Sequence, residues 1–262
     1  MSRFPGEKRL FILAEPRSGS SWLMETLNSH REIQLMTEVL NSGQPIQPLG
    51  ELLNHVLNSE IKKYIGGGER DLHDCLEYLE KTLAAPRGKK VRFCGCKILL
   101  NQLTLIGNGF PEKFLEFFRD ALFIFLYRTN LVAEQISLQL AHKRNVWHVN
   151  QQEQIALNKI TISPPVLVAN LEKSLERRER MRRLIAVGGQ PCLAFSYEEF
   201  FADAASALGK IFDFLGLADR NVAFSRELKG NPFRPRQVIE NFKEVRAYLE
   251  SYPLLLQMLL AE

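Results

Sequence analysis

A loop that follows the apolar run 10–14 carries residue types that bind phosphate. It reads Pro16-Arg17-Ser18-Gly19-Ser20-Ser21 and leads into an expected helix. The first N–H groups of a helix have no partner within the helix, and the helix dipole is positive at this end, so an anion is stabilised there. The forked donors of the Arg17 guanidinium also match phosphate oxygens. We therefore predict an anion site made by Arg17 and the backbone N–H groups of residues 18–21.

The same loop differs from the loop of nucleotide triphosphatases. That loop has a glycine at each end of a four-residue spacer, followed by Lys and Ser or Thr, whereas this one has a single glycine and no such lysine. A kinase or ATPase also places an acidic residue after a second strand to hold magnesium, but the apolar run 123–126 leads into Tyr127-Arg128. An ATP- or GTP-using enzyme is therefore a weaker alternative, as is a simple helix cap after a buried strand.

These residues resemble the sulfotransferase family, whose phosphosulfate-binding loop reads Pro-Lys/Arg-Ser-Gly-Ser/Thr-Ser/Thr. A second family element is a strand that ends in Arg and is followed nine residues later by Ser, which Arg128 and Ser137 match. In the family this pair binds the 3′-phosphate of 3′-phosphoadenosine 5′-phosphosulfate (PAPS). A strand-end Arg and a Ser about two helical turns later can converge on one anion, although a lone Ser is more often an ordinary helix surface residue. The closest pattern is that of bacterial carbohydrate-type sulfotransferases.

The resemblance implies further cofactor contacts. The segment Phe195-Ser196-Tyr197-Glu198-Glu199-Phe200, followed by a helix that ends at Phe214-Leu215-Gly216, is similar to the third family element. In the family, the Tyr of this turn and the Trp after the first loop approach adenine, so Tyr197 and Trp22 become candidates, with core packing as the alternative for Trp22. The late basic loop 228–234 similarly suggests Lys229 and Arg234 near the 3′-phosphate.

The chemistry requires a base for the attacking group and cations for the charge that develops on the leaving phosphate. Carbohydrate-modifying members use a Glu shortly after the first helix, and Glu38 occupies this position, with an exposed salt link as its alternative. His30 is the next candidate, followed by His142 or His148. Lys97, at the end of the run 91–96, resembles a Lys that faces donor or acceptor, although a buried stem with an exposed amine would also explain it.

Composition bounds the remaining possibilities. The chain has 262 residues, of which 45% are hydrophobic, and neither a linker nor a repeat divides it, so we expect one domain over 1–262. A formal charge of +4 is too small to indicate nucleic acid as a partner. The four cysteines show neither a disulfide framework nor zinc-finger spacing, so buried free thiols and no metal are expected. The N-terminal residues lack an apolar signal core and no run is long enough to span a membrane, which predicts a cytoplasmic protein.

Short apolar runs alternate with amphipathic segments, as in an α/β protein with a central parallel sheet flanked by helices. We expect the cofactor across the carboxyl ends of the strands, where Arg17 and Arg128 lie. The expected strands are 10–14, 33–36, 91–98, 121–126 and 192–196. The expected helices are 20–29, 70–83, 111–118, 131–143, 165–186, 203–215 and 236–250.

The acceptor is the least defined part of the prediction. We expect a hydroxyl of a carbohydrate or glycoconjugate as the acceptor, with a lipid, polyketide, peptide or phenol as alternatives. The segments 42–90 and 143–190 match nothing recognisable and so do not decide between them. Sulfation of nitrogen and the oligomeric state are also open, as is a non-catalytic nucleotide-binding protein.

Four phenylalanines at 110–118 have the helical spacing of core residues. The charged run 176–183 is expected to be a solvated face with internal ion pairs, the alternative being a docking surface for an anionic acceptor.

Overall fold

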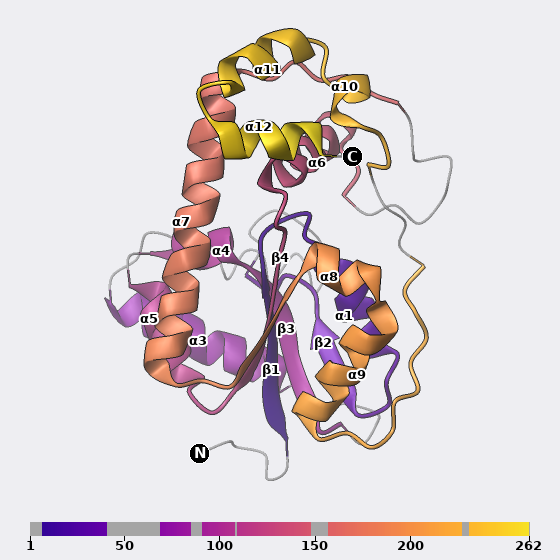
Figure 1. Cartoon of the computed structure of the whole chain (residues 1–262). Coiled ribbons are helices and arrows are strands. Elements are labelled where there is room, and N and C mark those ends of the chain that lie inside the picture. Colours follow the sequence, from indigo (N-terminus) through magenta and orange to yellow (C-terminus); the bar gives the residue numbers. More distant parts are fainter. Residues whose placement is uncertain are drawn as a thin grey trace. The chain divides into compact units, whose positions relative to one another are not determined.

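The sheet predicted from the sequence is present and entirely parallel. The computed structural model describes residues 7–40, 69–84, 91–107, 109–147, 157–226 and 231–261. Within these residues one sheet has the order β2-β3-β1-β4-β5 (Figure 1). Its strands are β1 (Lys8–Ala14), β2 (Ile33–Met36), β3 (Phe93–Leu99), β4 (Leu122–Tyr127) and β5 (Cys192–Ser196). The α/β fold class is therefore confirmed.

Both faces of β1 are buried, which explains why its run is continuously apolar. Side chains alternate along a strand, so Phe11 and Leu13 enter one core cluster while Leu10 and Ile12 enter the other. The first cluster includes α3 (Glu69–Leu83), α4 (Leu100–Ile106) and α5 (Phe110–Phe117). The second includes α1 (Ser20–Asn28), α8 (Tyr197–Ala202) and α9 (Ala204–Leu215). These helices cover the two faces of the sheet (Figure 1).

The chain forms two compact units. The first unit holds the sheet and comprises Met1–Glu15, Gly19–Tyr127 and Arg177–Ser225. The second comprises Pro16–Ser18, Arg128–Glu176 and Arg226–Glu262. It contains α6 (Leu131–Arg144), α10 (Pro235–Val238), α11 (Phe242–Leu249), α12 (Pro253–Leu260) and the first part of α7 (Pro164–Gly188). The segments of the two units alternate along the chain, so no single position in the sequence separates them.

The second unit departs most from the expected helices. The helix expected over 236–250 is interrupted, because Ile239 forms an isolated parallel bridge with Ile160. Ile160 N–H donates to Val238 O at 2.7 Å and Glu240 N–H donates to Ile160 O at 2.9 Å. These bonds divide the segment into α10 and α11. Three helices that the sequence analysis did not list are also present, namely α4, α8 and α12.

The phenylalanines of α5 mostly belong to the core, as predicted. Phe110, Phe114 and Phe118 lie in the first core cluster, and Phe117 is 37% exposed. All four cysteines are free thiols; Cys75, Cys94 and Cys96 are buried and Cys192 is half-buried. The expectation of buried free thiols is thus confirmed for three of the four.

The prediction of a solvated face for the charged run 176–183 was confirmed only in part, because four of its residues are exposed but several of its cations have partners outside the run. Arg177 pairs through two donors with Glu15, which is 1% exposed, and Arg180 pairs with Glu112 of α5. Arg178 is buried, with its guanidinium 5.2 Å from the centre of the Tyr127 ring. The pair Arg182–Glu179 is of the expected internal kind. Most of these cations therefore attach α7 to the sheet unit, which the helical spacing of charges cannot show.

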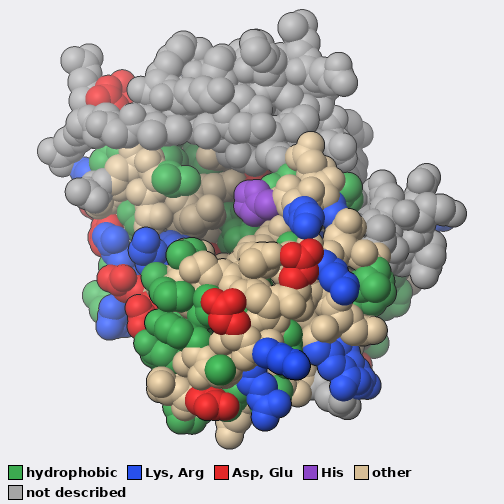
Figure 2. Space-filling view, turned by 90° about the horizontal axis from the view of Figure 1, so that it is seen from above, with side chains coloured by type: hydrophobic (Ala, Val, Ile, Leu, Met, Phe, Trp, Pro, Cys, Tyr) green, Lys and Arg blue, Asp and Glu red, His purple; other side chains and the backbone are tan. Residues whose placement is uncertain are grey.

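The surface does not gather charge of one sign on the face that Figure 2 shows. Among the coloured side chains there, basic and acidic groups are mixed with hydrophobic ones, in keeping with the formal charge of +4. In the described ranges, no helix has both the length and the apolar character needed to cross a bilayer.

Candidate active site

Lys97 and Glu38 meet at the carboxyl ends of neighbouring strands of the first unit. Lys97 lies near the end of β3, and Glu38 follows β2 by two residues. The Lys97 Nζ atom is 2.8 Å from Glu38 Oε1 and donates to Ser21 Oγ, also at 2.8 Å. Strand alternation turns Lys97 toward α1, which carries Ser21. The structure thus brings together three residues that the sequence analysis proposed separately.

The environment of this pair is largely closed to solvent. The side chain of Lys97 is 3% exposed and that of Glu38 is 21% exposed. A buried ammonium is tolerated only where anionic or hydrogen-bonding partners compensate the loss of water. Of the alternative of an exposed salt link, the ion pair is therefore present, with Lys97 as the partner, but Glu38 is not exposed. The other carboxylate oxygen, Oε2, accepts a hydrogen bond from Gln102 Nε2 at 3.0 Å. A carboxylate beside a buried cation can accept a proton while the cation stabilises developing negative charge.

Arg17 and Ser137 are in contact within the second unit. The Arg17 Nε donates to Ser137 Oγ at 3.3 Å, and its NH1 group donates to Trp147 O. Arg17 has φ 65°, a left-handed conformation that costs a non-glycine residue about 1–2 kcal/mol. Strain of this kind concentrates at ligand-binding positions. The strained backbone of Arg17 therefore makes this loop a candidate binding site.

The helix that positions Ser137 begins with a well-formed cap. Asn130, two residues after Arg128, accepts a hydrogen bond from Ala133 N at 2.8 Å and caps α6. This cap sets where the helix starts and therefore where Ser137 lies on it. Arg128 is half-buried at the end of β4, and Ser137 is 8% exposed. Both belong to the second unit, with Pro16, Arg17 and Ser18.

Gly19 is required by the close packing of α8 on the loop. It is the N-cap of α1 with φ 81°, and as a glycine it supplies no side-chain cap. A Cβ atom at Gly19 would lie 2.7 Å from Phe201 Cε2 and 3.0 Å from Tyr197 Cδ2. Only glycine fits both the backbone angle and the space. Ser20 opens the helix and is 4% exposed, and Ser21 follows it.

The start of α8 is held by a reciprocal cap that places Tyr197. Ser196 Oγ accepts a hydrogen bond from Glu199 N–H, and Glu199 Oε2 accepts bonds from the Ser196 N–H and hydroxyl at 3.0 and 2.8 Å. These bonds, first the one from the backbone N–H and then the one from the hydroxyl, lower the pKa of Glu199. Tyr197, the next residue, is half-buried with its ring centre 4.5 Å from that of Phe201.

Two exposed aromatic residues beside Trp22 were not predicted. The Trp22 ring stacks on Phe224 at 5.6 Å and meets Phe201 edge-on at 5.2 Å. Phe201 is 36% exposed and Phe224 is 54% exposed. Trp22 also packs against the second core cluster, so its core interpretation and its base-binding interpretation are compatible. The sequence shows two adjacent phenylalanines, Phe200 and Phe201, after Tyr197, but it does not show that Phe201 is the exposed one.

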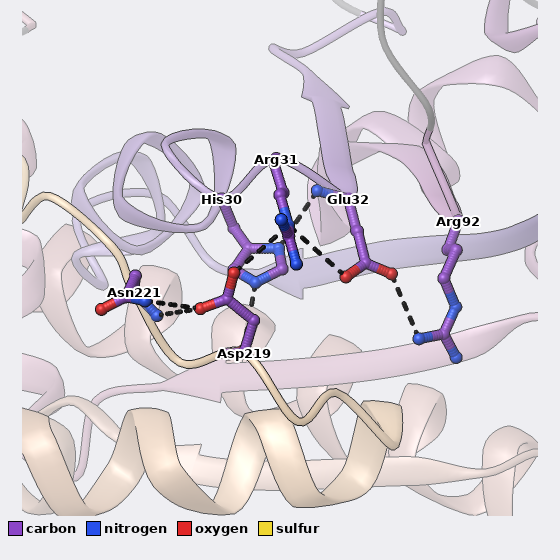
Figure 3. A network of polar contacts seen from close by, with 6 residues as sticks. All are labelled: His30, Arg31, Glu32, Arg92, Asp219 and Asn221. Atoms are coloured by element: carbon purple, nitrogen blue, oxygen red, sulfur yellow. Dashed lines mark hydrogen bonds and ion pairs between the residues drawn. The ribbon is translucent and has the colours of Figure 1, made fainter.

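His30 lies before the amino end of β2, whereas Glu38 follows its carboxyl end. Figure 3 shows it in a polar network with residues that precede β2 and β3 or follow α9. Its ring is buried, and Nδ1 accepts from Glu32 N–H at 3.2 Å. The Nε2 atom, 3.1 Å from Asp219 O, therefore carries the proton. Both nitrogens serve the network, so the geometry favours Glu38 over His30 as base.

The same network joins charged side chains around the histidine. Arg92 pairs with Glu32 and Arg31 pairs with Asp219, both at 3.2 Å. Hydrogen bonds from the Asn221 backbone and side chain, with the charge of Arg31, lower the pKa of Asp219. The network thus ties the end of α1 to the segment after α9, which is a structural role.

The remaining candidates are dispersed. Arg234 is exposed at the start of α10 in the second unit, and the His142 ring meets Trp147 at 4.7 Å. Lys229 and His148 lie outside the described residues. Within the described ranges, no group of three or more His, Cys, Asp or Glu side chains could hold a metal ion.

Comparison with known proteins identifies a family. A model described as the sulfotransferase family matches residues 9–221. A sulfotransferase from Alicyclobacillus acidocaldarius, known from a crystal structure, is 16% identical, with 97% of this chain and 95% of that chain covered and a TM-score of 0.48. No curated protein matches. The family match includes Arg17, Glu38, Lys97, Arg128 and Tyr197 and ends before Arg234.

Proposed function

The chain belongs to the sulfotransferase family, and from this premise we propose that it transfers a sulfuryl group from PAPS to an acceptor hydroxyl. The observation that carries the proposal is the 2.8 Å contact of Lys97 Nζ with Glu38 Oε1, because it places a buried cation and a carboxylate in one site. Transfer of a sulfuryl group needs both. The hydrogen bond from Lys97 to Ser21 also connects this site to the start of α1.

The residues present fit the chemistry of PAPS. We assign Arg17 and the backbone N–H groups of 18–21 to the 5′ end, and Arg128 and Ser137 to the 3′-phosphate. Guanidinium, hydroxyl and amide donors are those that bind phosphate oxygens. Tyr197 and Trp22 are the proposed adenine contacts, and Lys229 and Arg234 remain proposed contacts of the late basic loop. We also propose that 1–262 acts as a single functional domain, although its chain forms two compact units.

In the proposed reaction Glu38 accepts the proton of the acceptor hydroxyl as that oxygen forms a bond to sulfur. PAPS supplies the sulfur–oxygen bond that breaks, and its electron pair leaves with the 5′-phosphate oxygen. Lys97 and Arg17 stabilise the negative charge that develops there. The products are a sulfate ester and adenosine 3′,5′-bisphosphate, with the proton on Glu38 passing to solvent.

We propose a carbohydrate or glycoconjugate as the acceptor, because a Glu base after the first helix resembles the carbohydrate-modifying members. A lipid, polyketide, peptide or phenol is the alternative, and screening would distinguish them. We also propose a cytoplasmic location, which the four free cysteines support, since thiols stay reduced there.

Calorimetric titration tests the proposal directly. Adenosine 3′,5′-bisphosphate without metal is compared with ATP plus magnesium and with adenosine 5′-monophosphate. We expect micromolar affinity for the bisphosphate, weakened about 30-fold by Arg128→Ala, since a buried charge-assisted hydrogen bond contributes about 2 kcal/mol. Arg246→Ala, an exposed cation of the same unit, is the control and should change nothing.

Three results would contradict the proposal or a part of it. Preference for ATP with magnesium would indicate a kinase. Bisphosphate affinity that Arg128→Ala leaves unchanged would remove the assignment of the 3′-phosphate. Binding without turnover of any acceptor would instead indicate a nucleotide-binding protein.

A further inference from the structure

We propose that Gln102 is a positioning residue, which holds the carboxylate of Glu38 in place for proton transfer. This inference rests on the proposed function, because it concerns the base of that reaction. Gln102 is the third residue of α4 and is 6% exposed. Its Nε2 donates to Glu38 Oε2 and its Oε1 accepts from the Leu99 N–H, both at 3.0 Å.

The orientation of the Gln102 amide follows from its two partners. A backbone N–H can only donate, so it faces the amide oxygen, and a carboxylate can only accept, so it faces the amide NH₂ group. Leu99 ends β3 and α4 begins at the next residue. Gln102 therefore caps the start of the helix with one end of its side chain and holds Glu38 with the other.

The result is a carboxylate held from two directions. Lys97 of β3 contacts Oε1, and Gln102 of α4 contacts Oε2. Rotation about the last side-chain bond of a glutamate is otherwise only weakly restricted, so two fixed donors select one orientation. A carboxylate has about four acceptor positions, so these two hydrogen bonds do not by themselves prevent Glu38 from accepting a proton.

The neutrality of Gln102 matters for the chemistry. Lys97 is the charged group that contacts Glu38 in the bonds described, and a second cation in place of Gln102 would further stabilise the charged carboxylate and weaken it as a base. A glutamate there would keep the cap on Leu99 N–H but would set a like charge against Glu38. A leucine would remove both hydrogen bonds. Glutamine, glutamate and leucine at position 102 therefore differ in three properties: the hydrogen bond to Leu99 N–H, the hydrogen bond to Glu38 and the charge.

The first experiment needs no acceptor. The carboxyl carbon of Glu38 is followed by ¹³C NMR through a pH titration, with Glu38→Gln to assign the signal. In Gln102→Glu we expect the titration midpoint to move to higher pH by about one unit, because the new carboxylate opposes the charge. Thr104→Ala is the matched control, since Thr104 is exposed on the same helix and donates only locally, to Asn101 O. It should leave the midpoint unchanged.

The second experiment measures turnover. Release of adenosine 3′,5′-bisphosphate from PAPS is followed with trehalose, N-acetylglucosamine, p-nitrophenol and a tyrosine peptide as acceptors. We expect Gln102→Leu to lower kcat about 10- to 100-fold, as for other residues that orient a catalytic group. The affinity for adenosine 3′,5′-bisphosphate should stay within about threefold, because Gln102 contacts the base and not the phosphates. Gln102→Glu keeps the helix cap and should therefore stay folded. Because its new carboxylate opposes the charge of Glu38, the acid limb of its pH–kcat profile should shift to higher pH.

The outcomes separate this inference from the proposed function. If the unaltered chain turns over PAPS and both Gln102 variants keep its kcat, pH profile and Glu38 titration, the inference is overturned and the function stands. If the unaltered chain neither binds the bisphosphate nor turns over PAPS, the proposed function fails, and the positioning role fails with it.

Discussion

At the scale of single residues, the burial of Lys97 gives the site its chemical character. An ammonium group that is 3% exposed loses most of its hydration, and Glu38 and Ser21 replace it. In such surroundings the charge is screened little, so it acts strongly on any negative charge that develops nearby. Replacing this lysine should therefore affect turnover more than binding.

We expect Lys97→Met to lower kcat about 100-fold or more, since removal of one group that stabilises the transition state has this effect in other enzymes. Affinity for adenosine 3′,5′-bisphosphate should also fall, but by less than kcat, because the product carries the charge of the 5′-phosphate without the geometry of the transition state. Steady-state kinetics and calorimetry together measure the two quantities. Lys210→Met, an exposed lysine of α9, is the control. Equal losses of turnover and bisphosphate affinity would indicate that Lys97 contributes to binding alone and adds nothing in the transition state.

At the scale of elements, short helices place the functional side chains. α4 and α8 follow directly on β3 and β5, so their first residues lie at the carboxyl edge of the sheet. The sequence analysis missed both helices, since each is short and continues a strand without an intervening loop. Their caps are nevertheless local: Gln102 accepts from Leu99 N–H, and Ser196 and Glu199 bond reciprocally.

Loss of the α8 cap should destabilise the fold measurably. Ser196→Ala removes a hydroxyl that accepts from Glu199 N–H and donates to its carboxylate, and loss of such a cap costs about 1 kcal/mol. Urea unfolding at pH 7 measures this change. Since α8 carries Tyr197 and Phe201 onto Gly19, affinity for adenosine 3′,5′-bisphosphate should fall as well.

Glu199 adds a pH dependence whose sign follows from its lowered pKa. A carboxyl with a lower pKa in the folded than in the unfolded state stabilises the fold above its unfolded value, about 4.3, and this contribution is lost as pH falls through the folded value. The stability difference between the unaltered chain and Glu199→Gln should therefore be full at pH 7 and should shrink as the pH falls below the unfolded value. Glu116→Gln, on exposed α5 surface, should show no such trend. A difference that persists in acid would contradict a role for the charge.

At the scale of the whole molecule, the two units share one chain in alternation, and α7 contributes to both. The sheet unit contains all four cysteines, whereas Trp147 belongs to the helical unit. Burial raises the pKa of Cys75 to about 12 and that of Cys192 to about 11, and it also raises that of Cys96. Native thiols should therefore react slowly with a thiol reagent at pH 8, because the thiolate is the reactive form.

These probes test whether 1–262 unfolds as one domain. In Trp22→Phe, the fluorescence of Trp147 reports on the helical unit, while thiol reactivity reports on the sheet unit. We expect both to follow one urea transition, with four thiols reacting after unfolding, as for a two-state domain. Two separated transitions would show that the units unfold independently.

The sequence by itself determined the local features of this protein. The five strands, the phosphate-type loop and the Arg128–Ser137 spacing were predicted because apolar runs, small-residue turns and helical spacing are properties of neighbouring residues. The same local reasoning predicted one continuous helix over 236–250, which the bridge from Ile160 interrupts.

Only the tertiary structure decided which side chains meet. Lys97 contacts Ser21 across 76 positions of the chain, and Gln102 contacts Glu38 across 64. Both contacts depend on the strand order, which sets β3 between β2 and β1. The placement of His30 is different in kind: it precedes β2 whereas Glu38 follows it, so the two lie at opposite ends of one strand. The tertiary structure also decides which charged side chains are buried. Lys97 and Arg178 are buried because distant segments pack over them, which the pattern of neighbouring residues cannot predict.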